Sequence, residues 1–177
     1  MTADSPTWDC RWPDPVALQV ASERILQSRP ADDPSLNRRL AIRVQMDPPD
    51  QPTDPIRALL VTPWAVERIY WNNTAQPTPP IRHALPLTAD SQGRVMAGLG
   101  VILEYATHKV PVLIAWEPEV GHHFVETLLP SVRDCGSVEE AIAVALGRKP
   151  LYPPKRSVTD HLSVPVSRRN LFGIFRS

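Results

Sequence analysis

The sequence is poor in glycine and cysteine and carries no net charge. Only 7 of its 177 residues are glycine and 2 are cysteine, while 19 basic residues balance 19 acidic ones. The two cysteines, Cys10 and Cys135, are too few for a disulfide framework and are typical of a reducing compartment. A net charge of zero excludes a chain that is basic overall, as many nucleic-acid-binding proteins are.

Long hydrophobic runs and common catalytic motifs are also missing. No stretch approaches the roughly 18 apolar residues that a membrane-spanning helix needs. The first residues have neither a basic region nor an apolar core, so we expect no signal peptide. The sequence contains no GxSxG, P-loop or GxGxxG motif, which removes most of the support for common hydrolases and nucleotide-binding enzymes. These absences predict a soluble, cytoplasmic protein.

Proline, by contrast, is abundant, and charge is unevenly distributed. There are 21 prolines, about twice the usual share of ~5%, and these predict extended connections and few long elements. Residues 148–177 carry seven basic residues and one acidic residue, a net charge of +6, which leaves −6 on residues 1–147. This asymmetry indicates a tail that meets an acidic partner, folds back on the body of the protein or stays solvated.

Hydrophobic periodicity predicts one α+β domain over residues 15–147. An irregular arm (residues 1–14) precedes it, and an extended, proline-rich basic tail (residues 148–177) follows it. Helices are predicted at residues 15–28, 119–129 and 137–146, and strands at residues 39–46, 58–61, 94–105 and 109–116. Residues 64–71 fit either one or two helical turns or a strand after a kink. We expect about four strands in a mainly antiparallel sheet, packed by three helices.

Two of the predicted helices have cap signals. Asp14 is a suitable N-cap before Pro15, which fits the first helical turn. Ser137 and Glu140 form a capping box, and Gly147 follows the second helix at its C-cap.

Four side chains could carry chemistry. On a helix, His122 and Glu126 share one face and His123 adds a third potential ligand, but two ligands do not make a metal site. A surface or partly buried pair is the alternative for these residues. Cys135 could be a nucleophile, although a small buried thiol explains it without further groups.

Two other segments differ from ordinary core sequence. In Thr62–Pro63–Trp64, an apolar strand is broken by proline and followed by a large aromatic residue. This can be plain packing, or it can present Trp64 at the rim of a groove that anchors a partner. Near the C-terminus, Arg168 and Arg169 follow serine and precede a Leu-Phe pair, in the manner of a twin-arginine export signal. Such signals are N-terminal and have a longer apolar stretch, so this segment cannot serve as one.

Together these two segments resemble the HybE/HupJ-type family of NiFe-hydrogenase assembly chaperones. Members have an apolar strand running into Thr-Pro-Trp, as in residues 61–64, and end in a basic tail of the Arg-Arg…Leu-Phe-Gly type, as in residues 168–173. The resemblance covers most of residues 15–177. This chain departs from the family at Asn72, where a Pro-Gly turn is usual, and at residues 112–118, where the family's cysteine and serine are missing.

The resemblance implies a non-enzymatic chaperone without cofactor or bound metal. It would bind the large- or small-subunit precursor of an uptake hydrogenase in the cytoplasm, until the metal centres are in place and twin-arginine export can proceed. An acidic body with an aromatic-rimmed groove would attract a signal peptide, which is a basic stretch followed by an apolar one. The partner-binding residues implied are Thr62, Pro63, Trp64, Trp71, Arg168, Arg169, Leu171 and Phe172.

Other functions fit parts of the sequence. The protein could be a binding or structural module of another assembly that docks through its basic tail. It could be a small metal-binding protein that uses His122, His123 and Glu126. Attachment to a membrane surface through residues 171–175 is a further alternative. We also hypothesise that residues 167–175 mimic a twin-arginine signal and occupy the same groove until a precursor displaces them.

Overall fold

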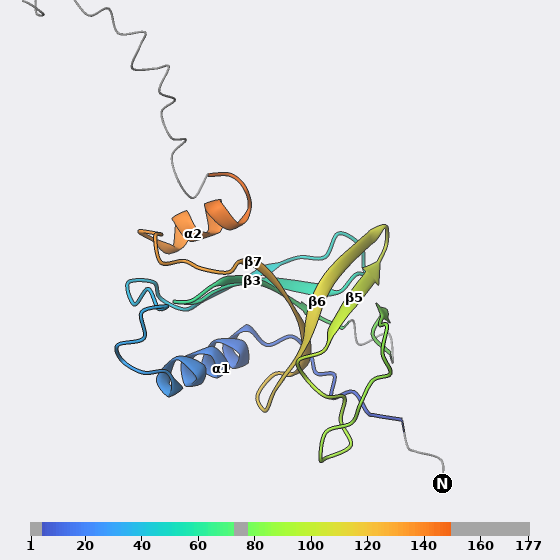
Figure 1. Cartoon of the computed structure of the whole chain (residues 1–177). Helices are drawn as coiled ribbons and strands as arrows, with labels where there is room; N and C mark the ends of the chain where they lie inside the picture. Colours follow the sequence, from blue (N-terminus) through green and yellow to red (C-terminus); the bar gives the residue numbers. More distant parts are fainter. Residues whose placement is uncertain (1–4, 73–77, 150–177) are drawn as a thin grey trace, which may run out of the picture.

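Seven β-strands form one antiparallel sheet in the order β1-β2-β3-β7-β6-β5-β4 (Figure 1). This computed structural model describes residues 5–72 and 78–149. The strands are β1 (Arg43–Asp47), β2 (Ile56–Val61), β3 (Val66–Trp71), β4 (Ile81–Arg82), β5 (Gly100–Tyr105), β6 (His108–Glu117) and β7 (Gly121–Leu129).

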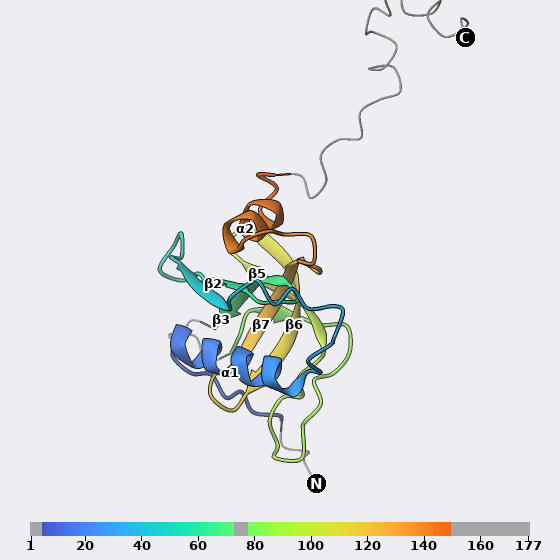
Figure 2. The same ribbon diagram turned by 90° about the vertical axis from the view of Figure 1, so that its left-hand side faces the viewer.

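Two helices pack on opposite faces of the sheet (Figure 2). Helix α1 (Pro15–Ser28) begins where predicted, and the Asp14 carboxylate accepts hydrogen bonds from the first free backbone N–H groups, at Val16 and Ala17. Helix α2 (Val138–Ala145) is capped by the Ser137 hydroxyl, as the capping box predicts. In the described part of the chain, no helix is long and apolar enough to cross a membrane.

The core consists of three clusters divided between the faces. Under α1, Leu18 and Ala21 pack on Ala58, Leu60, Ile69 and Trp71 of β2 and β3. Under α2, Ala141 packs on Leu59 and Val61 of β2 and on Val66 of β3. The third cluster contains Tyr70, Val101, Leu103, Val112, Ile114 and Phe124, and it is covered by Trp8 of the N-terminal arm and by Val95, Leu87 and Leu99.

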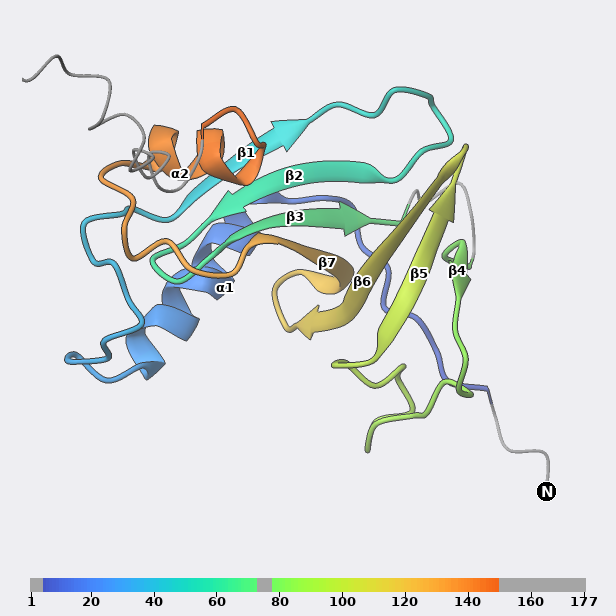
Figure 3. The same ribbon diagram turned by 45° about the horizontal axis from the view of Figure 1, so that its top comes forward.

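Strands β6 and β7 separate part-way along their length. Their pairing runs from Glu117–Gly121 to Leu113–Val125 and stops there. Beyond this point β6 stays with β5 and β7 stays with β3, so the two halves of the sheet diverge (Figure 3). We call this divergence the fork. On one face it is bridged by Tyr70 and Tyr105, whose ring centroids lie 6.0 Å apart.

The prediction of a helix at residues 119–129 was wrong. Gly121 adopts a positive φ of 74° at the end of a turn, and the chain continues as strand β7. Residues from His122 onward alternate between the two faces, and β7 lies between β3 and β6. Pairing on both sides therefore decides the conformation, although the spacing of His122 and Glu126 also fits a helix.

The other differences concern the number and the ends of the strands. About four strands and three helices were expected, and the described residues form seven strands and two helices. Residues 66–71 are a strand, which resolves the alternative left open for 64–71. The segment 94–99 is a loop in which Arg94 and Val95 make isolated bridges to Thr7 and Ala89, so β5 starts later than predicted. The two-residue β4 lies in a proline-rich stretch and was not predicted. The predicted basic tail falls almost wholly outside the described residues.

Candidate functional site

The Thr62–Pro63–Trp64 motif forms the turn between β2 and β3. The Thr62 backbone N–H donates to the Ala65 carbonyl (3.0 Å), and the Thr62 hydroxyl oxygen accepts from the Ala65 N–H (3.1 Å). Pro63 supplies a fixed φ within this turn. The Asn37 N–H donates to the Pro63 carbonyl at 2.7 Å, which ties the turn to the preceding loop. The motif is therefore a hairpin turn, held by hydrogen bonds between Thr62 and Ala65 and joined to the preceding loop through the Pro63 carbonyl.

Of the predicted partner-binding residues that the structure describes, Trp64 is the one that reaches the surface. Thr62, Pro63 and Trp71 are fully buried, so their side chains hold the fold. The Trp71 ring belongs to the core cluster under α1. Arg29 lies over the Trp64 ring at 4.6 Å from its centroid, a cation–π contact at the end of α1.

Trp64 stands at one end of a cavity of about 260 Å³ between α1 and the sheet, which we call the α1 cavity. Leu18, Ala21, Ser22 and Ile25 of the helix line its roof. Its floor is formed by side chains of four strands: Leu60, Ile69, Ala115 and Val125. Its polar lining is Arg29, Glu67, Glu117 and His123.

Glu67 and His123 lie at opposite ends of this cavity. In the β3–β7 register, Ile69 faces Val125, Glu67 is two residues away in one direction and His123 is two residues away in the other. Burial raises the pKa of the Glu67 carboxyl, against the opposing effect of Arg29. The Glu67 carboxylate makes no hydrogen bond or ion pair to another described residue.

His123 is neutral and presents a free acceptor. Its side chain is 4% exposed, and burial lowers its pKa to about 4. Its Nδ1 lies 3.0 Å from the Gly121 carbonyl, which can only accept, so Nδ1 carries the proton. The lone pair of Nε2 is thus left without a hydrogen-bond donor among the described residues.

A second hollow, an apolar trough at the fork, adjoins the α1 cavity. Val125 lines both hollows, and the fork trough has a volume of about 460 Å³. Ile102, Pro111 and Leu113 supply much of its apolar surface, and Leu113 is 49% exposed. Residues 108–112 of β6 and 126–129 of β7 have no described strand on the sides that face each other.

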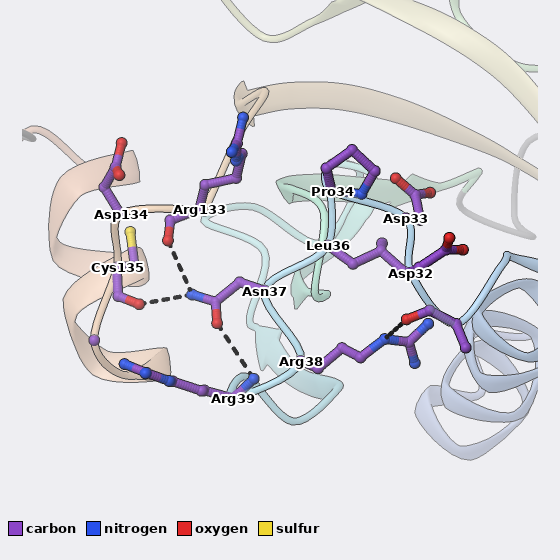
Figure 4. Close-up of a pocket in the computed structure, with 12 residues that line it drawn as sticks. Asp32, Asp33, Pro34, Leu36, Asn37, Arg38, Arg39, Arg133, Asp134 and Cys135 are labelled. Carbon is purple, nitrogen blue, oxygen red and sulfur yellow. Dashed lines mark hydrogen bonds between the residues drawn. The ribbon is translucent and has the colours of Figure 1, made fainter.

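A larger hollow of about 770 Å³ lies beside α2 and is open and polar (Figure 4). Asn37 crosses it, donating from Nδ2 to the Val132 and Cys135 carbonyls at 3.0 and 2.7 Å. The Cys135 side chain is 3% exposed, and burial raises the pKa of its thiol, with nearby Glu140 and Asp134 adding to the effect. A protonated, buried thiol is a poor nucleophile, so the alternative of a structural thiol holds.

His122 and Glu126 do not form a metal site. On a strand, four residues separate them by about 13 Å, and His123 points to the other face. Both His122 ring nitrogens are occupied, since Nδ1 accepts from the Asp9 N–H and Nε2 donates to the Val95 carbonyl, each at 2.8 Å. The Glu126 carboxylate accepts from the Tyr70 hydroxyl at 2.7 Å. The described residues contain no group of three or more His, Cys, Asp or Glu that could hold a metal ion.

His122 instead fastens the N-terminal arm to the sheet. Besides the Asp9–His122 bond, the His122 N–H donates to the Asp9 carbonyl at 2.8 Å, and the Asp9 carboxylate accepts from the Trp116 indole at 2.9 Å. Arg11 holds the pKa of the Asp9 carboxyl below its usual range. A Cβ atom at Gly121 would lie 2.5 Å from the Asp9 carbonyl oxygen, so this close approach requires glycine.

Sequence reasoning missed Glu67 and His123 as a pair. If residues 66–71 are taken as a strand, Glu67 lies on the same face as Ile69. This alternation is the sequence pattern from which the position of Glu67 could have been predicted. The tail residues predicted to bind a partner, Arg168, Arg169, Leu171 and Phe172, lie outside the described residues. Comparison with protein-family models, with curated proteins and with solved structures gives no match in any of the three.

Proposed function

We propose that the protein is a non-enzymatic, cytoplasmic assembly chaperone. It binds a precursor subunit of a NiFe uptake hydrogenase before cofactor completion and twin-arginine export. The observation that supports this function is the pair of neighbouring hollows on one face of the sheet, the α1 cavity and the fork trough, which share Val125 as a lining residue. The α1 cavity holds the carboxylate of Glu67 beside Trp64, and the fork trough is apolar.

A hollow with an acidic group beside an apolar hollow complements a signal peptide, in which a basic stretch precedes an apolar one. The sides of β6 (residues 108–112) and β7 (126–129) that pair with no described strand add a second means of recognition. An extended segment entering the fork can form backbone hydrogen bonds to such an edge while its side chains occupy the trough.

The test is a pulldown from cells that make an uptake hydrogenase, with this protein as bait and with mass spectrometry identifying the captured subunits. The small-subunit precursor is supplied with and without its signal peptide. Leu113→Asp in the fork trough should abolish capture. Met46→Asp is the matched control, because Met46 is also an exposed apolar side chain (39%) but lies on the edge strand β1.

Capture that requires the signal peptide and Leu113 supports a chaperone that monitors export. Capture of the large-subunit precursor regardless of the signal moves the role to assembly of the active site. Recovery of neither subunit overturns the proposal and favours a binding module of another assembly.

The basic tail is tested separately. If residues 167–175 compete for the groove, deletion of residues 165–177 should tighten binding of a signal peptide, because an attached segment competes at an effective concentration on the order of millimolar. Unchanged or weaker binding would remove the competing tail from the proposal and leave the groove in place.

A further inference from the structure

We infer that the outer edge of β1 pairs with the β1 strand of a second copy of this chain, antiparallel and about a two-fold axis at Gln45. Residues 43–47 read Arg-Val-Gln-Met-Asp, and this order is complementary to itself when it is reversed. The inference rests on the edge of the sheet and goes beyond the proposed function.

The two edges of the sheet are not alike. Short strands and proline protect sheet edges against pairing with another chain. Edge strand β4 has two residues, and Pro79 and Pro80 directly precede it. Edge strand β1 has five residues, none of them proline or lysine, and pairs with β2 along its whole length. No described strand lies on its other side (Figure 3). The β1 edge is therefore open to a further strand.

The backbone groups that point outward from β1 belong to Val44 and Met46. In the β2–β3 turn the Thr62 N–H donates to the Ala65 carbonyl, so alternation turns the odd-numbered residues of β2 toward β1. These residues face the odd-numbered residues of β1, which leaves the even-numbered ones directed away from β2. In the two-fold pair, Val44 of each copy faces Met46 of the other, and each such pair exchanges both hydrogen bonds of an antiparallel ladder.

The side chains across the axis are complementary. At both ends of the pair, Arg43 lies opposite Asp47 of the second copy. These positions exchange no backbone hydrogen bonds, so their side chains approach most closely. Opposite charges in such a pair stabilise a sheet, and like charges destabilise it. Between the two ends, Val44 lies opposite Met46, which is 39% exposed and gains an apolar neighbour.

Arg43 and Asp47 retain groups for this pairing beside the partners they already have. Arg43 Nη1 donates to Glu139 at 2.8 Å, and its other guanidinium nitrogens bind no described residue. Asp47 Oδ2 lies 3.4 Å from Arg57 Nε, and Oδ1 binds no described residue. The dimer thus forms a row of alternating charges from Glu139 and Arg43 to Asp47 and Arg57 of the second copy. Because the Arg43 and Asp47 side chains are 51% and 48% exposed, we expect a reversible dimer.

The fork is remote from this interface. In the sheet, β2, β3 and β7 lie between β1 and the fork. A dimer therefore carries two forks, one in each copy, and a monomer keeps its own. Met46→Asp, the control in the pulldown, retains its fork in either state.

The experiment measures the molar mass of the whole protein by sedimentation equilibrium at concentrations up to about 1 mM, which reveals even weak association. We expect a dimer. Arg43→Asp and Asp47→Arg each place like charges at both ends of the pair, so each variant alone should be monomeric. Mixed in equal amounts they should form a heterodimer, because opposite charges then meet at both ends. Arg82→Asp is the matched control and should still dimerise, since Arg82 is an exposed arginine of the opposite edge strand.

A cross-link tests the register. Opposed Cα atoms at a position such as Gln45 lie about 4.5 Å apart, within the range of a disulfide. With oxidised glutathione as the oxidant, Gln45→Cys should form an intermolecular disulfide at least tenfold faster than Gln92→Cys, in an exposed turn. A monomer at all concentrations, variants that stay monomeric when mixed, or equal cross-linking at the two positions overturns the inference. None of these results alters the pulldown, and failure of the pulldown leaves the molar mass unaffected.

Discussion

The two halves of the sheet are covered differently. The half formed by β1, β2 and β3 has a helix on each face, α1 on one and α2 on the other. The half formed by β4, β5 and β6 has the N-terminal arm and the loop before β5 on one face, while its other face forms the fork trough. Leu60 of β2 and Leu113 of β6 both point to the α1 face, and they are 4% and 49% exposed. Coverage by α1, not residue type, therefore decides which part of this face serves as core and which part is available to a partner.

The largest expected effect comes from truncating these two leucines. Leu60→Ala removes buried methyl groups beneath α1 and should lower the free energy of unfolding by about 2–5 kcal/mol. Leu113→Ala should change it by less than about 0.5 kcal/mol, since a half-exposed side chain leaves little cavity. Urea unfolding of both variants measures the difference. Similar losses would show that the fork face is core after all.

The free energy of unfolding should depend on pH through His123, which lies on β7, where the two halves of the sheet meet. The pKa of His123 is about 4 in the folded protein against an ordinary value of 6.5. The folded state thus binds fewer protons than the unfolded state between these values. The contribution of His123 to the free energy of unfolding is fully present above pH 6.5. It is lost as the pH drops toward 4, by about 3 kcal/mol at most.

Urea unfolding at a series of pH values checks this dependence. His123→Leu should flatten the curve between pH 6.5 and 4, whereas His108→Gln, at an exposed position on β6, should leave it unchanged. A curve of equal slope in His123→Leu would assign the acid sensitivity to other groups.

The arm that covers the second half can be displaced by one methyl group. Gly121→Ala places a Cβ against the Asp9 carbonyl at a φ of 74°, and it should cost about 1–3 kcal/mol and release the arm. Gly147→Ala is the control, because Gly147 has a similar φ of 67° but nothing within 4 Å of the added Cβ, and it lies after α2, away from the arm. Hydrogen exchange at the Asp9 amide is the readout. Fast exchange is expected in Gly121→Ala, and protection equal to that of the control would contradict the role of the close approach.

A smaller loss of stability is expected from a substitution at Thr62, in the hairpin turn of the half formed by β1, β2 and β3. Thr62→Val keeps the shape of the side chain but leaves the Ala65 N–H without its 3.1 Å hydrogen bond to the hydroxyl. The change should cost about 1–2 kcal/mol, while Thr62→Ser should recover most of it. Thermal unfolding of the two variants compares them. If valine were tolerated as well as serine, packing rather than the hydroxyl would explain Thr62.

Local signals in the sequence were reliable where local interactions decide the structure. Asp14 and Pro15 specify the start of α1, and Ser137 with Glu140 specifies α2, because each cap is completed within four residues. Strand β7 was mistaken for a helix because its partners lie on distant segments. The Asp9–His122 bond, for example, spans 113 positions of the sequence.

The candidate site was predictable in part. Trp64 was expected at the rim of a groove, and it lines the α1 cavity. Trp71 was placed with it on the basis of residue type, but a tryptophan at the end of a central strand is fully buried here. Glu67 and His123 line one cavity only because β3 pairs with β7, and no spacing along the chain encodes that register.

The fastening of the arm has a consequence for the order of events during synthesis. The arm leaves the ribosome before the residues that bind it, which include Gly93, Val95 and His122. At about 5–20 residues per second, translation delivers His122 on the order of ten seconds after Asp9. For that interval Trp8 lacks His122 and Phe124, the rings that it later contacts, whereas α1, β2 and β3 are all complete once Trp71 has been added. Docking of the arm is therefore a late step in the folding of the nascent chain, because it requires that β7 has been synthesised.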